Sequence, residues 1–339
     1  MPLWNEEWIV RNIPGNAKLK VKVFNKDDDK FADGYIGQIK ISRLIHYRKP
    51  SKGESIVGSL GQMNGFFHLL ISATLTRKEN HSLPRYTFDG PCRYFRHNSS
   101  TIDALTRFRT NRTYSTWKIE LRRVSQFFPP NQQQHWNRQY QAAKLIFGKY
   151  PTSLLSRATI KIAYRNLYGR TLKRNQNGYL LGADDLWKTV FSDPTLKRIR
   201  PCIYTYVIED STWLFGETGR QFWTDFASKH ALLSNGSRQV RYAGEFHIRP
   251  KYGWDRTDDE WELVFDNGSG TYAPSCDLLT NLKELMELNF PGLNIVTYEY
   301  RDPLLHESIK QVKEQIRLFR QLTPATCLLV NSYDDVTSF

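Results

Sequence analysis

The chain has 339 residues, of which 40% are hydrophobic and 14% aromatic, so it is long enough for about two globular domains with real cores. No apolar run approaches the roughly 20 residues of a membrane-spanning helix, and the N-terminus lacks the basic and apolar regions of a secretory signal. The four cysteines form no C-x-x-C pair, which argues against a zinc knuckle or disulfide framework. We therefore expect a cytoplasmic protein whose membrane contact is peripheral.

The net charge of +14 is unevenly distributed along the chain. Residues 93–200 contain 21 Lys and Arg against 5 Asp and Glu, whereas residues 201–339 contain 13 against 20. A basic region of this kind attracts anionic lipid or nucleic acid through a salt-sensitive field, or packs on the acidic C-terminal third.

The N-terminal region alternates short strand-like segments with Pro, Gly and Asp clusters. We expect strands at residues 4–10, 17–25, 34–41 and 65–75. Lys18, Lys20 and Lys22 alternate with apolar residues, and this period of two is typical of a half-buried strand.

Residues 77–134 are polar and irregular and predict a linker with some strand content, ending before a basic helical region at residues 135–200. Within it, Arg157, Lys161 and Arg165 recur every four residues on one helix face, while Leu154 and Leu155 lie on another. We expect the three basic residues to contact anionic lipid.

Residues 201–322 predict an α+β domain, followed by a tail at 323–339 that we expect to be disordered. Strands are expected near residues 202–210, 239–250, 260–274 and 293–300, and helices at 217–236, 278–288 and 304–320. The predicted fold class is therefore mixed, with β structure at the N-terminus and an α+β domain at the C-terminus.

Acidic and amide side chains gather between two predicted N-terminal strands. Asn25, Asp27 and Asp33 occupy relative positions 0, 2 and 8 of this loop. Calcium takes six to eight oxygen ligands, so a loop that crowds such side chains is a candidate calcium site.

This loop, with "PLWNEEW" before it and "GFFHLLISATL" after it, resembles the C2 domain, a β-sandwich that docks proteins on membranes, usually through calcium. The resemblance covers residues 1–76 and implies a partial all-β sandwich, because the strands and calcium loop that precede "PLWNEEW" in the family are absent. It favours a truncated chain, or a partner that covers the incomplete sandwich. Asn25 replaces the family's usual Asp, so we expect calcium affinity of about millimolar at best.

Residues 200–302 resemble a module of fungal C2-containing proteins of unknown function, through "RPCIYTYVIEDSTW", "VRYAGEFHIRP" and "DNGSGTYAP". Glu245 and His247 are two apart on a strand and so share a face, as a carboxylate and imidazole in acid-base catalysis would. Ser269 lies between glycines that would let backbone amides approach an anion. A buried histidine and a tight turn explain the same residues without catalysis.

We expect peripheral binding to an anionic phospholipid membrane, placing the α+β domain there. Nucleic acid is the alternative ligand of the basic region. An enzyme centred on Glu245 and His247, and a protein-interaction scaffold, are the competing classes.

Overall fold

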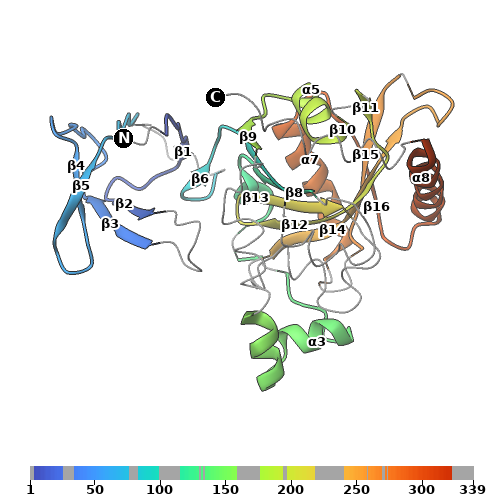
Figure 1. The fold of residues 1–339 in the computed structure, drawn as a ribbon, viewed down its shortest axis with the longest axis horizontal. Helices are drawn as coiled ribbons and strands as arrows, with labels where there is room; N and C mark the ends of the chain where they lie inside the picture. Colours follow the sequence, from blue (N-terminus) through green and yellow to red (C-terminus); the bar gives the residue numbers. More distant parts are fainter. Residues whose placement is uncertain are drawn as a thin grey trace, which may run out of the picture. The chain divides into compact units, whose positions relative to one another are not determined.

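The computed structural model describes residues 4–25, 34–75, 83–98, 115–129, 131–132, 134–158, 176–193, 197–217, 240–257, 259–268, 272 and 274–322. The chain divides into two compact units (Figure 1). Unit 2 comprises residues 10–87, and unit 1 comprises residues 1–9 and 88–339. Unit 2 is thus inserted into the chain of unit 1 rather than preceding it.

This division differs from the predicted one, which placed a linker at residues 77–134 and a helical region at 135–200. Arg93–Asn98 (β7), Ser115–Glu120 (β8) and Gln176–Tyr179 (β9) are strands of the unit 1 sheet. β7 and β9 lack a clear alternation of apolar and polar residues, since "RYFRHN" has polar and aromatic residues at both alternating sets of positions. Residues 4–9, expected as a strand, have no regular secondary structure.

Unit 2 contains a four-stranded antiparallel sheet in the order β2-β3-β4-β5. Its strands are Leu19–Asn25 (β2), Gly34–Ile41 (β3), Glu54–Val57 (β4) and Met63–Phe67 (β5). Its core is small and contains Val23, Ile39, Ile41 and Ile56. Two further strands, Val10–Arg11 (β1) and Thr87–Phe88 (β6), pair with each other at the ends of this segment.

Unit 1 is built on an eight-stranded sheet in the order β16-β15-β14-β12-β13-β8-β7-β9. Every pairing is antiparallel except that between β15 and β16. The remaining strands are Ile203–Glu209 (β12), Thr212–Glu217 (β13), Val240–Pro250 (β14), Trp261–Asp266 (β15) and Asn294–Tyr298 (β16). A small separate ladder joins Ser192–Asp193 (β10) to Arg198–Ile199 (β11).

Helices cover both faces of this sheet (Figure 1). Leu279–Asn289 (α7) packs through Leu282, Leu285 and Met286 on the face that carries Phe246. Pro303–Leu322 (α8) contacts His247, the next residue of β14, so it lies on the opposite face. Further helices are Val124–Phe127 (α2), Gln141–Phe147 (α3), Ala183–Leu186 (α5), the π-helix Trp187–Phe191 (η1) and the 3-10 turn Cys276–Leu278 (η2), and residues 151–158 are also helical.

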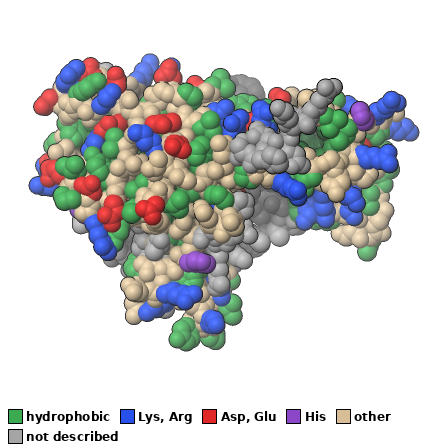
Figure 2. All heavy atoms as spheres, turned by 180° about the vertical axis from the view of Figure 1, so that it is seen from behind, with side chains coloured by type: hydrophobic (Ala, Val, Ile, Leu, Met, Phe, Trp, Pro, Cys, Tyr) green, Lys and Arg blue, Asp and Glu red, His purple; other side chains and the backbone are tan. Residues whose placement is uncertain are grey.

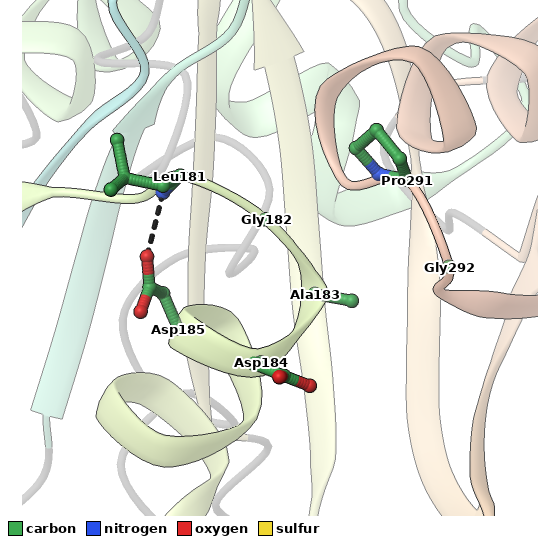
Figure 3. Close-up of a pocket in the computed structure, with 7 residues that line it drawn as sticks. All are labelled: Leu181, Gly182, Ala183, Asp184, Asp185, Pro291 and Gly292. Atoms are coloured by element: carbon green, nitrogen blue, oxygen red, sulfur yellow. Dashed lines mark hydrogen bonds between the residues drawn. The ribbon is translucent and has the colours of Figure 1, made fainter.

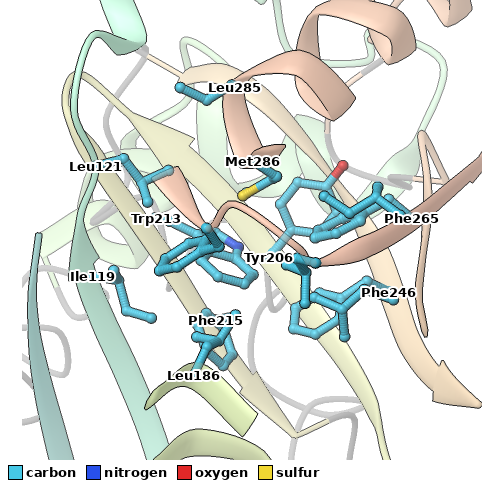
Figure 4. Close-up of a cluster of buried hydrophobic side chains, with 14 of the residues drawn as sticks. Ile119, Leu121, Leu186, Tyr206, Trp213, Phe215, Phe246, Phe265, Leu285 and Met286 are labelled. Atoms are coloured by element: carbon cyan, nitrogen blue, oxygen red, sulfur yellow. The ribbon is translucent and has the colours of Figure 1, made fainter. Parts of the chain in front are cut away.

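The core between the sheet and α7 is unusually aromatic (Figure 4). Trp213 lies 4.4 Å from Phe215 and 5.4 Å from Phe246 between ring centroids, and all three side chains are fully buried. Aromatic rings bury a large area each and add favourable edge and offset contacts. These contacts hold α7 against the central strands of the sheet.

The structure confirms the prediction of a mixed fold: antiparallel sheets together with helices. The four strands expected between residues 202 and 300 are present as β12, β14, β15 and β16, and the helices expected at 278–288 and 304–320 as α7 and α8. The helix predicted at 217–236 and the tail at 323–339 lie outside the described residues.

Candidate functional site

Four exposed lysines lie on or next to the paired strands β2 and β3 of unit 2. Lys18, Lys20 and Lys22 are exposed, while Leu19, Val21 and Val23 between them face the core. The strand register places Lys20 directly opposite Lys40 of β3, which is also exposed. We call Lys18, Lys20, Lys22 and Lys40 the lysine face.

Basic residues dominate the rest of unit 2 as well (Figure 2). Among its described residues, Glu54 is the single carboxylate, and its Oε1 accepts a hydrogen bond of 2.8 Å from the Tyr47 hydroxyl. Burial and this contact raise the pKa of Tyr47 to about 12. The ten lysines and arginines are Arg11, Lys18, Lys20, Lys22, Lys40, Arg43, Arg48, Lys49, Lys52 and Arg85.

Of the three predicted calcium ligands, the structure describes Asn25 alone. Asn25 ends β2 and pairs with Gly34 at the start of β3, so the two ends of segment 26–33 lie side by side. Asp27 and Asp33 fall in that segment, outside the described residues. Within the described part of the chain, no group of three or more His, Cys, Asp and Glu is arranged to hold a metal.

The structure confirms that Glu245 and His247 share one face of β14, but it gives them different partners. Glu245 Oε1 accepts a hydrogen bond of 3.4 Å from Thr205 on β12. His247 Nε2 lies 2.7 Å from Ser308 Oγ beneath α8. Ser269, the third catalytic candidate, lies outside the described residues.

His247 is buried, with 1% of its surface exposed. Burial, and then the charge of Arg249, lower its pKa to about 3. Arg249 also donates to Ser308 Oγ at 2.9 Å and forms an ion pair with Glu262 at 2.6 Å. The imidazole is therefore neutral at physiological pH, and its described contacts attach α8 to the sheet.

Asp266, at the end of β15, is a buried carboxyl with a strongly raised pKa. Burial raises its pKa to about 7, and the nearby charge of Glu245 adds to this rise. Its Oδ1 accepts backbone hydrogen bonds from Glu245 at 3.0 Å and Gly268 at 2.7 Å. An Asp-Asn-Gly triplet at the end of a buried strand was the available sequence signal.

The next residue, Asn267, holds the same loop in place. Its side chain donates to the Pro274 carbonyl at 3.2 Å and accepts from the Tyr300 backbone at 2.8 Å. Asp266 and Asn267 thus connect the loop after β15 to β14 and to the segment after β16. Asp266 can exchange a proton near neutral pH, but with 3% of its surface exposed it has little access to a substrate.

The predicted lipid-binding helix begins at Pro151 and is described over residues 151–158. Arg157 lies on it and is half-buried, whereas Lys161 and Arg165 fall outside the described residues. Leu154 and Leu155, expected on the inward face, are instead 61% and 70% exposed.

A hollow of about 460 Å³ lies between the loop before α5 and the turn after α7 (Figure 3). It is lined by Leu181, Gly182, Ala183, Asp184, Asp185, Pro291 and Gly292. Asp185 accepts a 2.8 Å hydrogen bond from the Leu181 backbone. Asp184 is the exposed carboxylate of the hollow. The side chains that line this hollow do not form a recognisable ligand-binding site.

No protein-family model, curated protein or solved structure matches this chain. Among the helices of the described ranges, none combines the length and the apolar character needed to cross a bilayer. The lysine face is therefore the feature on which a function is best argued.

Proposed function

We propose that unit 2 binds the surface of an anionic phospholipid membrane through the lysine face, and so brings unit 1 to that membrane. The observation that carries the proposal is the pairing of Lys20 with Lys40 on adjacent strands, flanked by Lys18 and Lys22. An exposed strand surface of one charge attracts anionic headgroups.

The energetics favour a ligand for these lysines over a structural role. Like charges directly opposite each other on antiparallel strands destabilise a sheet. The same charges contribute about 1 kcal/mol each near an anionic membrane surface. The repulsion between the lysines destabilises the free protein. Anionic headgroups relieve this repulsion when they neutralise the lysine charges.

We further propose that the unit 2 sheet is part of a C2-type sandwich, which rests on the sequence resemblance of the loop after β2 and of "GFFHLLISATL", since "PLWNEEW" belongs to unit 1. Calcium would then be held by Asn25, Asp27 and Asp33. One amide and two carboxylates make a weak site, because affinity follows ligand number and charge. The proposed membrane contact therefore does not require calcium, since the lysine face carries it alone.

Vesicle sedimentation tests the proposal. The full chain should pellet with phosphatidylserine-containing vesicles at low salt, and pelleting should fall as salt rises. Lys20→Gln/Lys40→Gln should weaken binding roughly ten- to thirtyfold, as expected for two charges of about 1 kcal/mol each. Lys310→Gln/Lys313→Gln, which removes the same charge from α8, is the matched control.

Equal binding by the two double variants would refute the lysine face as the contact. A calcium arm uses Asp27→Asn/Asp33→Asn: if calcium strengthens wild-type binding but not that of this variant, the loop is the calcium site. Competition by single-stranded or double-stranded nucleic acid at equal phosphate concentration tests the alternative ligand. Stronger binding to nucleic acid than to vesicles would replace the membrane in this proposal.

A further inference from the structure

The helix that begins at Pro151 presents two adjacent leucines to solvent. Leu154 is 61% and Leu155 70% exposed, and Tyr150 immediately before the helix is 70% exposed. Single exposed leucines are ordinary on protein surfaces, but two consecutive ones beside an exposed tyrosine form an apolar tip. We call Tyr150, Leu154 and Leu155 the leucine tip.

The local packing explains why the leucine tip points away from the rest of unit 1. Ser153 is fully buried, and its hydroxyl lies 3.4 Å from the Lys144 carbonyl of α3. Successive helical residues are rotated by about 100°, so burying position 153 turns positions 154 and 155 outward. The inward side of the helix is thus fixed by a polar contact rather than by its leucines.

Aromatic contacts fix α3, on which this helix rests, to the rest of unit 1. Phe147 at the end of α3 lies 5.9 Å from Tyr272 and 6.1 Å from Trp136 between ring centroids. Trp136 and Tyr272 also form a β-bridge. The leucine tip therefore stands on an anchored support.

The chain segment that carries the tip has charges of one sign. No Asp or Glu occurs in the sequence between Glu120 and Asp184, whereas Arg138, Lys144 and Lys149 are exposed and Arg157 is half-buried. Figure 2 shows hydrophobic side chains beside Lys, Arg and His side chains at the end of the part that carries α3 in Figure 1. Exposed leucines with tyrosine and flanking lysines are what an anionic bilayer interface accepts.

We propose that Leu154 and Leu155 insert into the headgroup and acyl boundary of an anionic bilayer, with Tyr150 at the interface and the surrounding cations on the headgroups. This inference rests on the proposed membrane function, to which it adds a second contact, on unit 1. The charge selects a bilayer over an apolar protein partner, because apolar protein interfaces are depleted of lysine.

The first experiment separates insertion from electrostatic attraction. Leu154→Ser/Leu155→Ser should weaken binding to phosphatidylserine vesicles by about tenfold or more, since burial of apolar area contributes to binding. The fraction bound at high salt should fall most, because apolar contact is not screened. Leu181→Ser/Leu304→Ser, which alters leucines that are 85% and 64% exposed elsewhere on unit 1, is the matched control and should bind like wild type.

The second experiment tests directly whether residue 155 enters the bilayer. An environment-sensitive dye on Leu155→Cys, in a chain with Cys276→Ser and Cys327→Ser, should shift to the blue when vesicles are added. The same dye on Leu181→Cys should not shift.

The outcomes distinguish the two proposals. If the tip variant binds like wild type and the dye at position 155 does not shift, insertion is refuted while the lysine face stands. If the tip variant loses binding but Lys20→Gln/Lys40→Gln does not, insertion stands and the lysine face fails. If the wild type binds no vesicles, both membrane contacts are refuted.

Discussion

Asp266 and His247 are buried ionisable side chains whose pKa values are displaced in opposite directions. Burial holds Asp266 at a pKa of about 7 instead of 3.8, and His247 at about 3 instead of 6.5. Between pH 4 and 6.5 the folded protein therefore holds one proton more than the unfolded chain at Asp266 and one fewer at His247. Their effects on the pH dependence of stability nearly cancel in the wild type.

Asp266→Asn should remove one of these two opposing effects on the pH dependence of stability. The raised pKa of Asp266 means that its contribution to stability is present below about pH 4 and is lost as pH rises to 7. Asparagine keeps an oxygen for the two backbone donors but does not titrate. The free energy of unfolding of the variant minus that of wild type should rise by on the order of 3 kcal/mol from pH 4 to 7 in urea titrations. A difference that does not change with pH would contradict the raised pKa.

His247→Gln should have the opposite effect. A lowered histidine pKa stabilises the fold above pH 6.5, and that contribution is lost as pH falls toward 3. Glutamine can still bond Ser308 but does not titrate. Relative to wild type, the variant should therefore gain stability on acidification from pH 6.5 to 4, by a similar amount. The double variant should restore the wild-type profile, and failure to do so would show that other groups set it.

Substitutions of Trp213 compare two contributions to stability in the aromatic core: the packing of the ring and the cost of burying its indole nitrogen. Among the described residues its buried indole nitrogen has no hydrogen-bond partner, which costs on the order of 1 to 3 kcal/mol. Trp213→Phe removes that cost along with part of the ring, so the free energy of unfolding should fall by less than about 2 kcal/mol. Trp213→Ala should lose about 3 to 5 kcal/mol. An equal fall in the free energy of unfolding in the two variants would show that the indole nitrogen does not destabilise the fold.

At the scale of elements, the sequence predicted most strands and helices of the C-terminal domain but not β13, a buried strand that pairs with β12. The buried strand β12 and the helices α7 and α8 were predicted close to their observed bounds. β7 and β8 fall in a segment predicted only as a linker with some strand content and β9 in one predicted as helical, since "RYFRHN" and "QNGY" show no alternation of apolar and polar residues. The contacts of Asp266 were also beyond prediction, because β14 and β15 bring them together from separate segments.

The β2–β3 pair carries a prediction about stability as well as binding. Since Lys20 and Lys40 are directly opposite, Lys20→Thr should raise the free energy of unfolding of unit 2 by a few tenths to about 1 kcal/mol at low salt. The gain should shrink in high salt, where exposed charges are screened. Lys52→Thr, an exposed lysine outside the strand pairs, should have no such effect. A loss of stability in Lys20→Thr would mean that the lysine stem packs on the sheet.

At the scale of the whole molecule, unit 2 is an insertion whose two connections to unit 1 leave from paired backbone. The Ile9 amide donates to the Gly90 carbonyl at 2.8 Å, and the Asp89 amide donates to the Ile9 carbonyl at 2.8 Å. Arg93 binds the segment before Ile9, through the Glu6 carboxylate at 2.7 Å and the Glu7 carbonyl at 2.7 Å. The first residues of the chain are thus part of unit 1, although the sequence alone predicted that they begin the N-terminal sandwich.

Replacing residues 10–87 with a linker of about four residues should therefore leave unit 1 folded, because strands paired as Ile9 and Asp89 are joined by hairpin loops of this length. Its urea unfolding, followed by tryptophan fluorescence, should match the transition that unit 1 shows in the full chain. The shortened chain lacks the lysine face but keeps the leucine tip, so it should bind anionic vesicles more weakly and with less salt dependence. If it does not fold, unit 2 contributes to the stability of unit 1; if it folds and binds as strongly as the full chain, the lysine face does not contact the membrane.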